Sequence, residues 1–209
     1  MSETFEERLA RALLIWRGSP KRGFELAEPL DPSRDRIVGD PAAPIAVVEY
    51  ACYGSPAGAR EDRALRAPLR EMLLERKICF AVRHFPLTDG SSHAWMAACA
   101  VEAADHQDRF WDLHEAISQA LAQMRSNRLE LSAILTLARD LGLDTDRLER
   151  DMKRPETGER ILRDFESGVR SGVNGVPSFY VAGIRQIIER PEELVARLGR
   201  ALSGDRAAL

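Results

Sequence analysis

The sequence predicts an α/β fold in which an all-helical subdomain is inserted into a mixed sheet. Three observations support this class. A strand, a helix and a second strand follow one another over residues 45–87, and only helical periodicity is found over about 90–170. Two short β-branched runs and a last helix then close the chain. With 209 residues, the chain is long enough for one domain with its own core.

Residues 1–37 predict a helical arm and a linker in front of a domain at 38–209. Apolar residues recur at helical spacing over 5–17, and Thr4 with Glu7 fits a capping box. The apolar face of this helix needs a cover. The chain's own core is one candidate and a second copy is the other, so a homodimer through the arm is a hypothesis.

The remaining elements follow in chain order. The linker holds "GFEL", which we interpret as a short edge strand, and "IAVVEYAC" predicts the first buried strand. Residues 56–76 have helical spacing with a kink expected at Pro68, and "KICFAVRHFPL" predicts the next strand. After the helical insertion, "SFYVA" and "RQIIE" flank a glycine-containing turn and predict a hairpin, and Pro191 opens the last helix.

Composition excludes several classes of function. The formal charge is −3, from 30 basic and 33 acidic residues that alternate along the helices, so no nucleic-acid partner is expected. The acidic amino terminus does not resemble a secretory signal, and no apolar run has the length of a membrane span, so we expect a cytoplasmic protein. Three cysteines match neither a disulfide framework nor a zinc pattern, and no metal is expected.

Several blocks resemble the DsbA-like branch of the thioredoxin superfamily. They are "VGDPAAPIAVVEYACYGSPAG", "RHFPL", "SHAWMAACAVEAA" with "FWDLHEAI", and "GVNGVPSFYVAG". The likeness runs from about residue 38 to 204 and implies a thioredoxin-like fold with a helical insertion. Related domains also occur fused to sodium/proton antiporters, so the resemblance does not determine a function.

The family places its nucleophilic cysteine after the first core strand, at a helix N-terminus. Counting from Glu49, that position falls at Ser55 and the position of the second cysteine at Gly58. A serine hydroxyl cannot exchange disulfides. We therefore predict a degenerate member of the family that has no dithiol oxidoreductase activity through this motif.

Ser55 and Pro56 allow two interpretations. Serine followed by proline is typical of a helix N-cap and the first helical residue. The pair also resembles the kappa-class glutathione transferases and chromene-carboxylate isomerases, which imply a serine that hydrogen-bonds the glutathione sulfur. Ala57 and Gly58 differ from the aromatic-containing sequence that is usual in that family.

Glu49 resembles the buried strand acid of the redox members, which takes a proton from the second cysteine. Without that thiol, Glu49 is either a relic or a base near a bound ligand. Cys52, in "CYGS", resembles the C-x-x-S of monothiol glutaredoxins. Cys52 precedes the start of the helix, so the helix N-terminus does not lower the pKa of its thiol as it does in such proteins. We therefore assign Cys52 no catalytic role and treat it as a candidate reactive thiol.

Val176 and Pro177 match the cis-proline loop of the family. In that resemblance the cis bond exposes the backbone of residue 176 for pairing with an extended peptide or with glutathione. His84 and His93 lie near the predicted corner, whereas His114 receives no role. Cys79, Cys99, Trp95, Phe110 and Trp111 are expected to be packing residues.

The sequence thus predicts a thioredoxin-like protein without dithiol activity. Such a protein would bind a peptide, a protein or a small thiol at the site formed by Ser55, Pro56, Val176 and Pro177. No cofactor is expected, although glutathione is a candidate ligand. The alternative is a glutathione-dependent transferase or isomerase of kappa type, in which Ser55 orients the thiolate and Glu49 assists.

Overall fold

The computed structural model describes residues 3–18, 24–87, 93–125 and 128–205. Its sheet has five strands in the order β1-β3-β2-β4-β5. β2 and β3 are parallel, and every other neighbouring pair is antiparallel. The strands are β1 (Arg36–Gly39), β2 (Ile45–Ala51), β3 (Ile78–His84), β4 (Ser178–Val181) and β5 (Ile184–Gln186). The predicted βαβ unit and the hairpin are confirmed.

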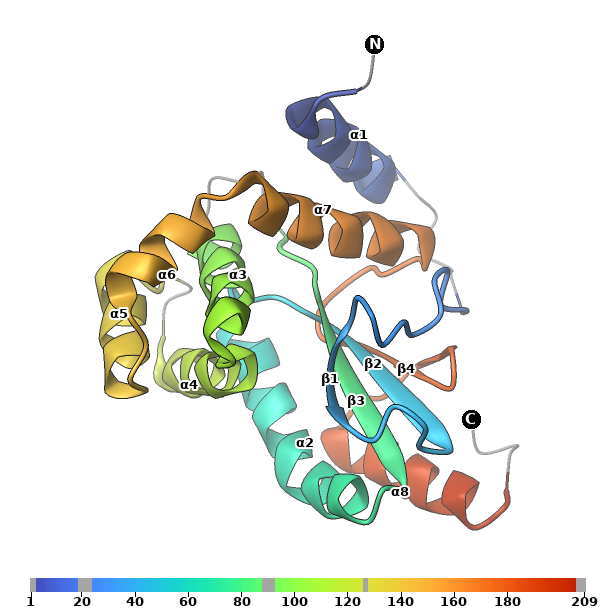
Figure 1. The fold of residues 1–209 in the computed structure, drawn as a ribbon. Coiled ribbons are helices and arrows are strands. Elements are labelled where there is room, and N and C mark those ends of the chain that lie inside the picture. Colours follow the sequence, from blue (N-terminus) through green and yellow to red (C-terminus); the bar gives the residue numbers. More distant parts are fainter. Residues whose placement is uncertain (1–2, 19–23, 88–92, 126–127, 206–209) are drawn as a thin grey trace.

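Helices cover both faces of this sheet. Figure 1 shows α2 (Pro56–Leu74) and α8 (Pro191–Leu202) on one side, and α7 (Pro155–Arg170) with the insertion on the other. Side chains of β2 alternate between the two cores, since Val47 packs with α2 and α8 whereas Val48 packs with the insertion. Glu49 lies two residues after Val47, so its side chain points to the same face of the sheet and its carboxyl group lies beneath α2.

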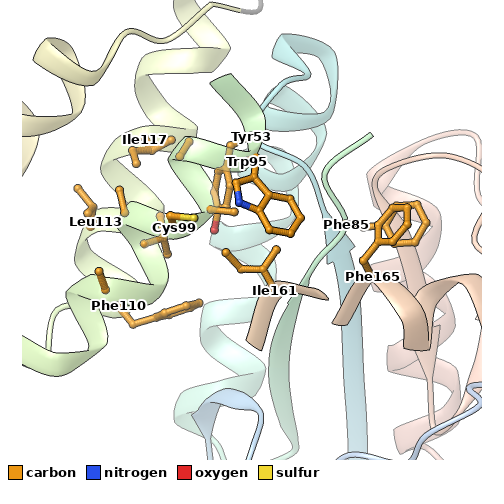
Figure 2. Packing of buried hydrophobic residues seen from close by; sticks show 14 of the residues in the cluster. Tyr53, Phe85, Trp95, Cys99, Phe110, Leu113, Ile117, Ile161 and Phe165 are labelled. Carbon is orange, nitrogen blue, oxygen red and sulfur yellow. The ribbon is translucent and has the colours of Figure 1, made fainter. Parts of the chain in front are cut away.

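The insertion is an all-helical subdomain built around one apolar helix. Its members are α3 (His93–Ala104), the short 3₁₀ turn η1 (Asp105–Gln107), α4 (Phe110–Gln123), α5 (Leu131–Asp140) and α6 (Thr145–Met152), followed by α7. In Figure 2, Trp95 and Cys99 of α3 lie among Phe110, Leu113 and Ile117 of α4. The small alanine side chains of α3 let its neighbours approach closely, which explains a helix that is buried nearly all round.

A buried ionic cluster joins the insertion to the sheet. Arg83 of β3 donates to both carboxylate oxygens of Asp35, at 2.9 and 2.8 Å. The next residue, His84, lies 3.2 Å from Glu102 of α3, and Arg36 binds the same carboxylate. His84 therefore contributes to this junction, although its ring also lies 5.9 Å from that of Tyr53.

Two local features of the structure differ from the prediction. β1 was not predicted, because its apolar run is only two residues long and is flanked by charged and turn-forming residues. "GFEL" forms only a single bridge, from Glu25 to Ile184, and its Gly23 lies outside the described residues. α2 contains Pro68 within one helix of 19 residues, and the kink at Pro68 stays a prediction.

The amino-terminal helix α1 (Phe5–Gly18) packs on α7. The predicted capping box is confirmed, since Thr4 N donates to Glu7 and Glu7 N donates to the Thr4 hydroxyl. Leu9 is buried, and the Trp16 indole donates to the carbonyl of Val173 at 2.9 Å. The chain's own core thus covers one apolar face of α1. Leu14 remains exposed, and the homodimer remains a hypothesis.

We predict that Leu9→Ala lowers the free energy of unfolding by about 2–4 kcal/mol, because it opens a cavity between α1 and α7. Leu14→Ala is the matched control and should change it by less than about 0.5 kcal/mol, since that side chain is 73% exposed. Urea unfolding at several protein concentrations measures both. An equally large, concentration-dependent loss for Leu14→Ala would contradict this account and favour burial of that side chain by a second copy.

Candidate functional site

Ser55 begins α2 as its N-cap, which confirms the structural interpretation of the Ser-Pro pair. Its backbone is extended and its Oγ accepts a hydrogen bond from Gly58 N at 3.0 Å. Pro56 occupies the first turn, where a missing N–H costs nothing. No acidic side chain lies in this turn. The positive end of the helix dipole at the corner is therefore not neutralised from within the turn.

Gly58 lets the first turn of α2 approach the loop before β4. A Cβ atom at Gly58 would lie 3.2 Å from Ser55 Oγ and 3.3 Å from Pro177 Cδ. Both distances are shorter than ordinary van der Waals contact. The structure thus brings together the two halves of the predicted site, the Ser55 corner and Pro177.

The loop that carries Pro177 is held from both sides. The Val176–Pro177 peptide bond is cis. The Ser178 hydroxyl donates to the carbonyl of Gly175 at 2.7 Å, and Arg185 donates to the carbonyl of Gly172 at 2.9 Å. Val176 itself is half-buried, and its backbone N–H and C=O have no hydrogen-bond partner among the described residues. Such a backbone is free to pair with an added extended chain.

A small cavity lies beneath this loop. Half-exposed residues surround its mouth, namely Cys52, Gly58, Val176 and Pro177, and buried polar residues form its floor, namely Glu49, Tyr53, Asp62, His114 and Ser118. Its volume is about 20 Å³, which is room for about one water molecule. Cys52, Glu49, Val176 and Pro177, all candidates from the sequence, therefore line one cavity.

Glu49 is 1% exposed and its Oε2 atom has no hydrogen-bond partner. Burial, followed by the charge of Asp62, raises the pKa of Glu49 well above its ordinary value, while Arg66 acts in the opposite direction. Burial and the Asp62 charge thus both favour the protonated form of Glu49.

A series of polar contacts runs from Asp62, the neighbour of Glu49, through Arg66 to His114. Arg66 donates to both oxygens of Asp62 at 3.1 Å, and it also contacts His114 Nε2. On the other side of the ring, His114 Nδ1 lies 2.7 Å from the Tyr53 hydroxyl. Burial and the Arg66 charge lower the pKa of His114 well below its ordinary value, so the ring is neutral.

Sequence reasoning missed Tyr53, Asp62 and Arg66 and assigned His114 no role. Asp62 and Arg66 have the i,i+4 spacing of a helical ion pair, which was the one available signal. Nothing in the sequence indicates that α4 would bring His114 against them.

The thiol of Cys52 is mostly enclosed. Burial raises the pKa of Cys52, against the opposing effect of hydrogen bonds from the backbones of Leu87 and Gly54. A reactive cysteine has the opposite shift. The other histidine proposed for the corner, His93, instead lies 3.2 Å from Glu130.

The described residues contain no group of three or more His, Cys, Asp or Glu side chains arranged to hold a metal ion. Within the same ranges, no helix has the length and apolar character needed to cross a membrane.

A capped helix that follows the first core strand and faces a cis-proline loop defines a thioredoxin-type corner. A family model described as "Thioredoxin" matches residues 32–198. The chain therefore belongs to the thioredoxin family.

Solved structures with the same fold include a thioredoxin-like oxidoreductase and a protein-disulfide isomerase. A thioredoxin-like oxidoreductase from Silicibacter pomeroyi superposes with a TM-score of 0.68 at 25% identity, over 83% of this chain and 94% of that one. BdbD from Bacillus subtilis gives a TM-score of 0.72 at 16% identity, over 87% and 100% of the two chains. The second likeness concerns the fold alone.

Curated relatives bear a different name. The Na(+)/H(+) antiporter NhaA 3 of Salinispora tropica is 36% identical over 179 residues, or 85% of this chain. The match covers 26% of that relative. The chain thus spans about a quarter of the length of such relatives.

We predict that Glu49→Gln and Glu102→Gln change the pH dependence of stability in opposite directions. The pKa of Glu49 is raised, so its contribution is complete below about pH 4.5 and is lost as the pH rises through its native pKa. Glutamine imitates the protonated form. Relative to wild type, Glu49→Gln should therefore become progressively more stable above pH 4.5.

Glu102 provides the opposite case. Burial alone would raise its pKa, but His84 and Arg36 lower the pKa of Glu102 to about 2. Its contribution, about 3 kcal/mol, should be complete above pH 4.5 and vanish as the pH falls towards 2. Urea unfolding between pH 3 and pH 8 tests both variants. A constant offset from wild type for Glu49→Gln across this range would contradict the buried proton on Glu49.

Proposed function

We propose that this protein binds the backbone of a peptide or protein, or a small thiol, at the Ser55 corner and the Val176–Pro177 loop. It does so without dithiol redox chemistry. The observation that carries the proposal is the unpaired, half-exposed backbone of Val176 beside a helix start with no acidic residue in its first turn.

The absence of redox chemistry follows from the positions of the sulfurs. Dithiol redox chemistry needs two cysteines within reach of each other, and the attacking one must be a thiolate. Positions 55 and 58 hold serine and glycine, and Cys79 and Cys99 are buried. Cys52 lies at the cavity mouth, but its pKa is raised by burial.

An open groove on the other side of Pro177 provides space for a peptide. Its volume is about 280 Å³, and its lining combines apolar residues, among them Phe24 and Ile187, with polar ones, among them Glu61 and Arg185. Phe24 and Ile187 are 56% and 67% exposed. These apolar surfaces would receive side chains of an extended peptide paired to Val176.

A glutathione-dependent transferase or isomerase is the second candidate, and one contact favours it. Ser55 Oγ accepts from Gly58 N, so the hydroxyl proton remains available to donate to a ligand. At a helix N-terminus, that donor and the helix dipole would both stabilise a bound thiolate. The sulfur then belongs to the substrate. The antiport activity in the names of the curated relatives is not part of either proposal.

We predict that S-alkylated insulin B chain, an extended peptide without thiols, binds saturably, and that methylating its backbone nitrogens weakens binding at least tenfold. The lost bonds would be those to Val176. Isothermal titration calorimetry measures both. The absence of saturable binding by either this peptide or reduced glutathione would contradict the proposal.

The same titration with reduced glutathione separates the two candidates. Binding that Ser55→Ala abolishes would favour the enzyme. The matched control is Asp144→Ala, which removes the N-cap of α6 and its bond to Arg147 N at a distant position. That control should leave glutathione binding unchanged, so a loss seen in both variants would reflect general destabilisation.

A further inference from the structure

The cavity beneath Pro177 presents one hydrogen-bond acceptor that the protein does not use. Glu49 Oε2 is buried and unpaired, and Glu49 is part of the cavity lining. The neighbouring Asp62 carboxylate is held by Arg66 with two hydrogen bonds. The unpaired Oε2 atom of Glu49 keeps lone pairs with which it can accept a hydrogen bond.

Tyr53 presents one hydrogen-bond donor to the same cavity. Arg66 is always protonated and has only donors, so His114 Nε2 must accept from it. A neutral imidazole that accepts at Nε2 carries its proton at Nδ1. That proton is donated to the Tyr53 oxygen across 2.7 Å. The hydroxyl proton of Tyr53 then has no acceptor among the described residues, and Tyr53 lines the cavity.

The group that complements these two atoms is a single heavy atom that both accepts and donates. An unsubstituted hydroxyl or thiol meets this requirement, and an ether, a thioether or an amine nitrogen bearing a positive charge does not. The volume of about 20 Å³ admits one such group. Ala51, Ala59 and Leu121 form apolar walls around it, and Ser118 is a further polar residue of the lining.

We propose that this cavity binds the terminal hydroxyl or thiol group of the ligand, with Tyr53 donating to that group and Glu49 accepting from it. The ligand enters past Gly58, Val176 and Pro177. This inference rests on the proposed binding function and narrows it to ligands that end in O–H or S–H. His114 and Arg66 orient the Tyr53 hydroxyl without touching the ligand.

The unpaired acceptor of Glu49 and the unpaired hydroxyl proton of Tyr53 are not explained by packing of the core. An unpaired acceptor and an unpaired hydroxyl proton, on side chains that are 1% and 3% exposed, both carry a desolvation cost. Most buried polar groups in folded proteins have a hydrogen-bond partner, so a partner is expected for these two atoms. Water has the same hydrogen-bonding capacity as the proposed group, so occupation by water alone is the competing outcome.

Three small probes test the inference on the full chain: ethanethiol, ethanol and ethyl methyl sulfide, each titrated under a phosphine reductant. Amide shifts in ¹⁵N NMR spectra should move and saturate at Tyr53, Gly58 and Val176 with ethanethiol or with ethanol. The sulfide lacks a donor and carries an extra methyl group, so it should cause no saturable shift. The ratio of the two affinities distinguishes a thiol ligand from an alcohol ligand.

Tyr53→Phe removes only the donor and should weaken the binding of the effective probe at least tenfold. Tyr180→Phe is the matched control, because its buried hydroxyl donates to the carbonyl of Ser171 at 2.8 Å and lies outside the cavity lining. The comparison of the three probes on the wild-type chain needs no variant, so it remains valid if Tyr53→Phe does not fold.

Three results would overturn the inference: no saturable shift with either ethanethiol or ethanol, an equal response to the sulfide, or unchanged affinity in folded Tyr53→Phe. Peptide binding that persists alongside such a result would leave the proposed function standing. Conversely, saturable binding of ethanol without any binding of peptide, glutathione or ethanethiol would support the cavity and contradict the proposed function.

Discussion

The close contact between the first turn of α2 and Pro177 is the constraint on which the candidate site depends. It exists because residue 58 has no side chain and because the Ser55 hydroxyl caps the helix. The contact closes a cavity over Glu49 and leaves the backbone of Val176 at the surface. A Cβ atom at position 58 would require the Ser55 hydroxyl or Pro177 to move by a few tenths of an ångström, and a bulkier side chain would displace them further.

Burial of Glu49 is the second determinant of the site. A carboxyl group on a central strand beneath a helix is costly unless it is protonated and paired. The neighbouring charge of Asp62 favours the protonated form of Glu49, and Arg66 in turn compensates the charge of Asp62. Arg66 then fixes the protonation of His114 and hence the direction in which Tyr53 can donate. The burial of Glu49 thus explains why Asp62, Arg66, His114 and Tyr53 are arranged as a connected series of polar contacts.

Much of the fold could be predicted because local signals agree with it. The β-branched run at Val47, the Ser55 cap and the hairpin at Ser178 each lie in sequence next to what determines them. β1 was missed because its pairing with β3 is decided by a distant strand and not by its own two apolar residues. The polar floor of the cavity could not be predicted for the same reason. Tyr53 and His114 are 61 positions apart and meet only through tertiary packing.

We infer that the thioredoxin corner of this chain is intact and lacks only its two sulfurs. The double variant Ser55→Cys/Gly58→Cys restores both, and insulin reduction measures whether the corner then exchanges disulfides. Wild type should show no turnover above background, and the double variant should gain clear turnover because the helix terminus lowers the pKa of the new thiol. Turnover by wild type, or none by a folded double variant, would contradict the account.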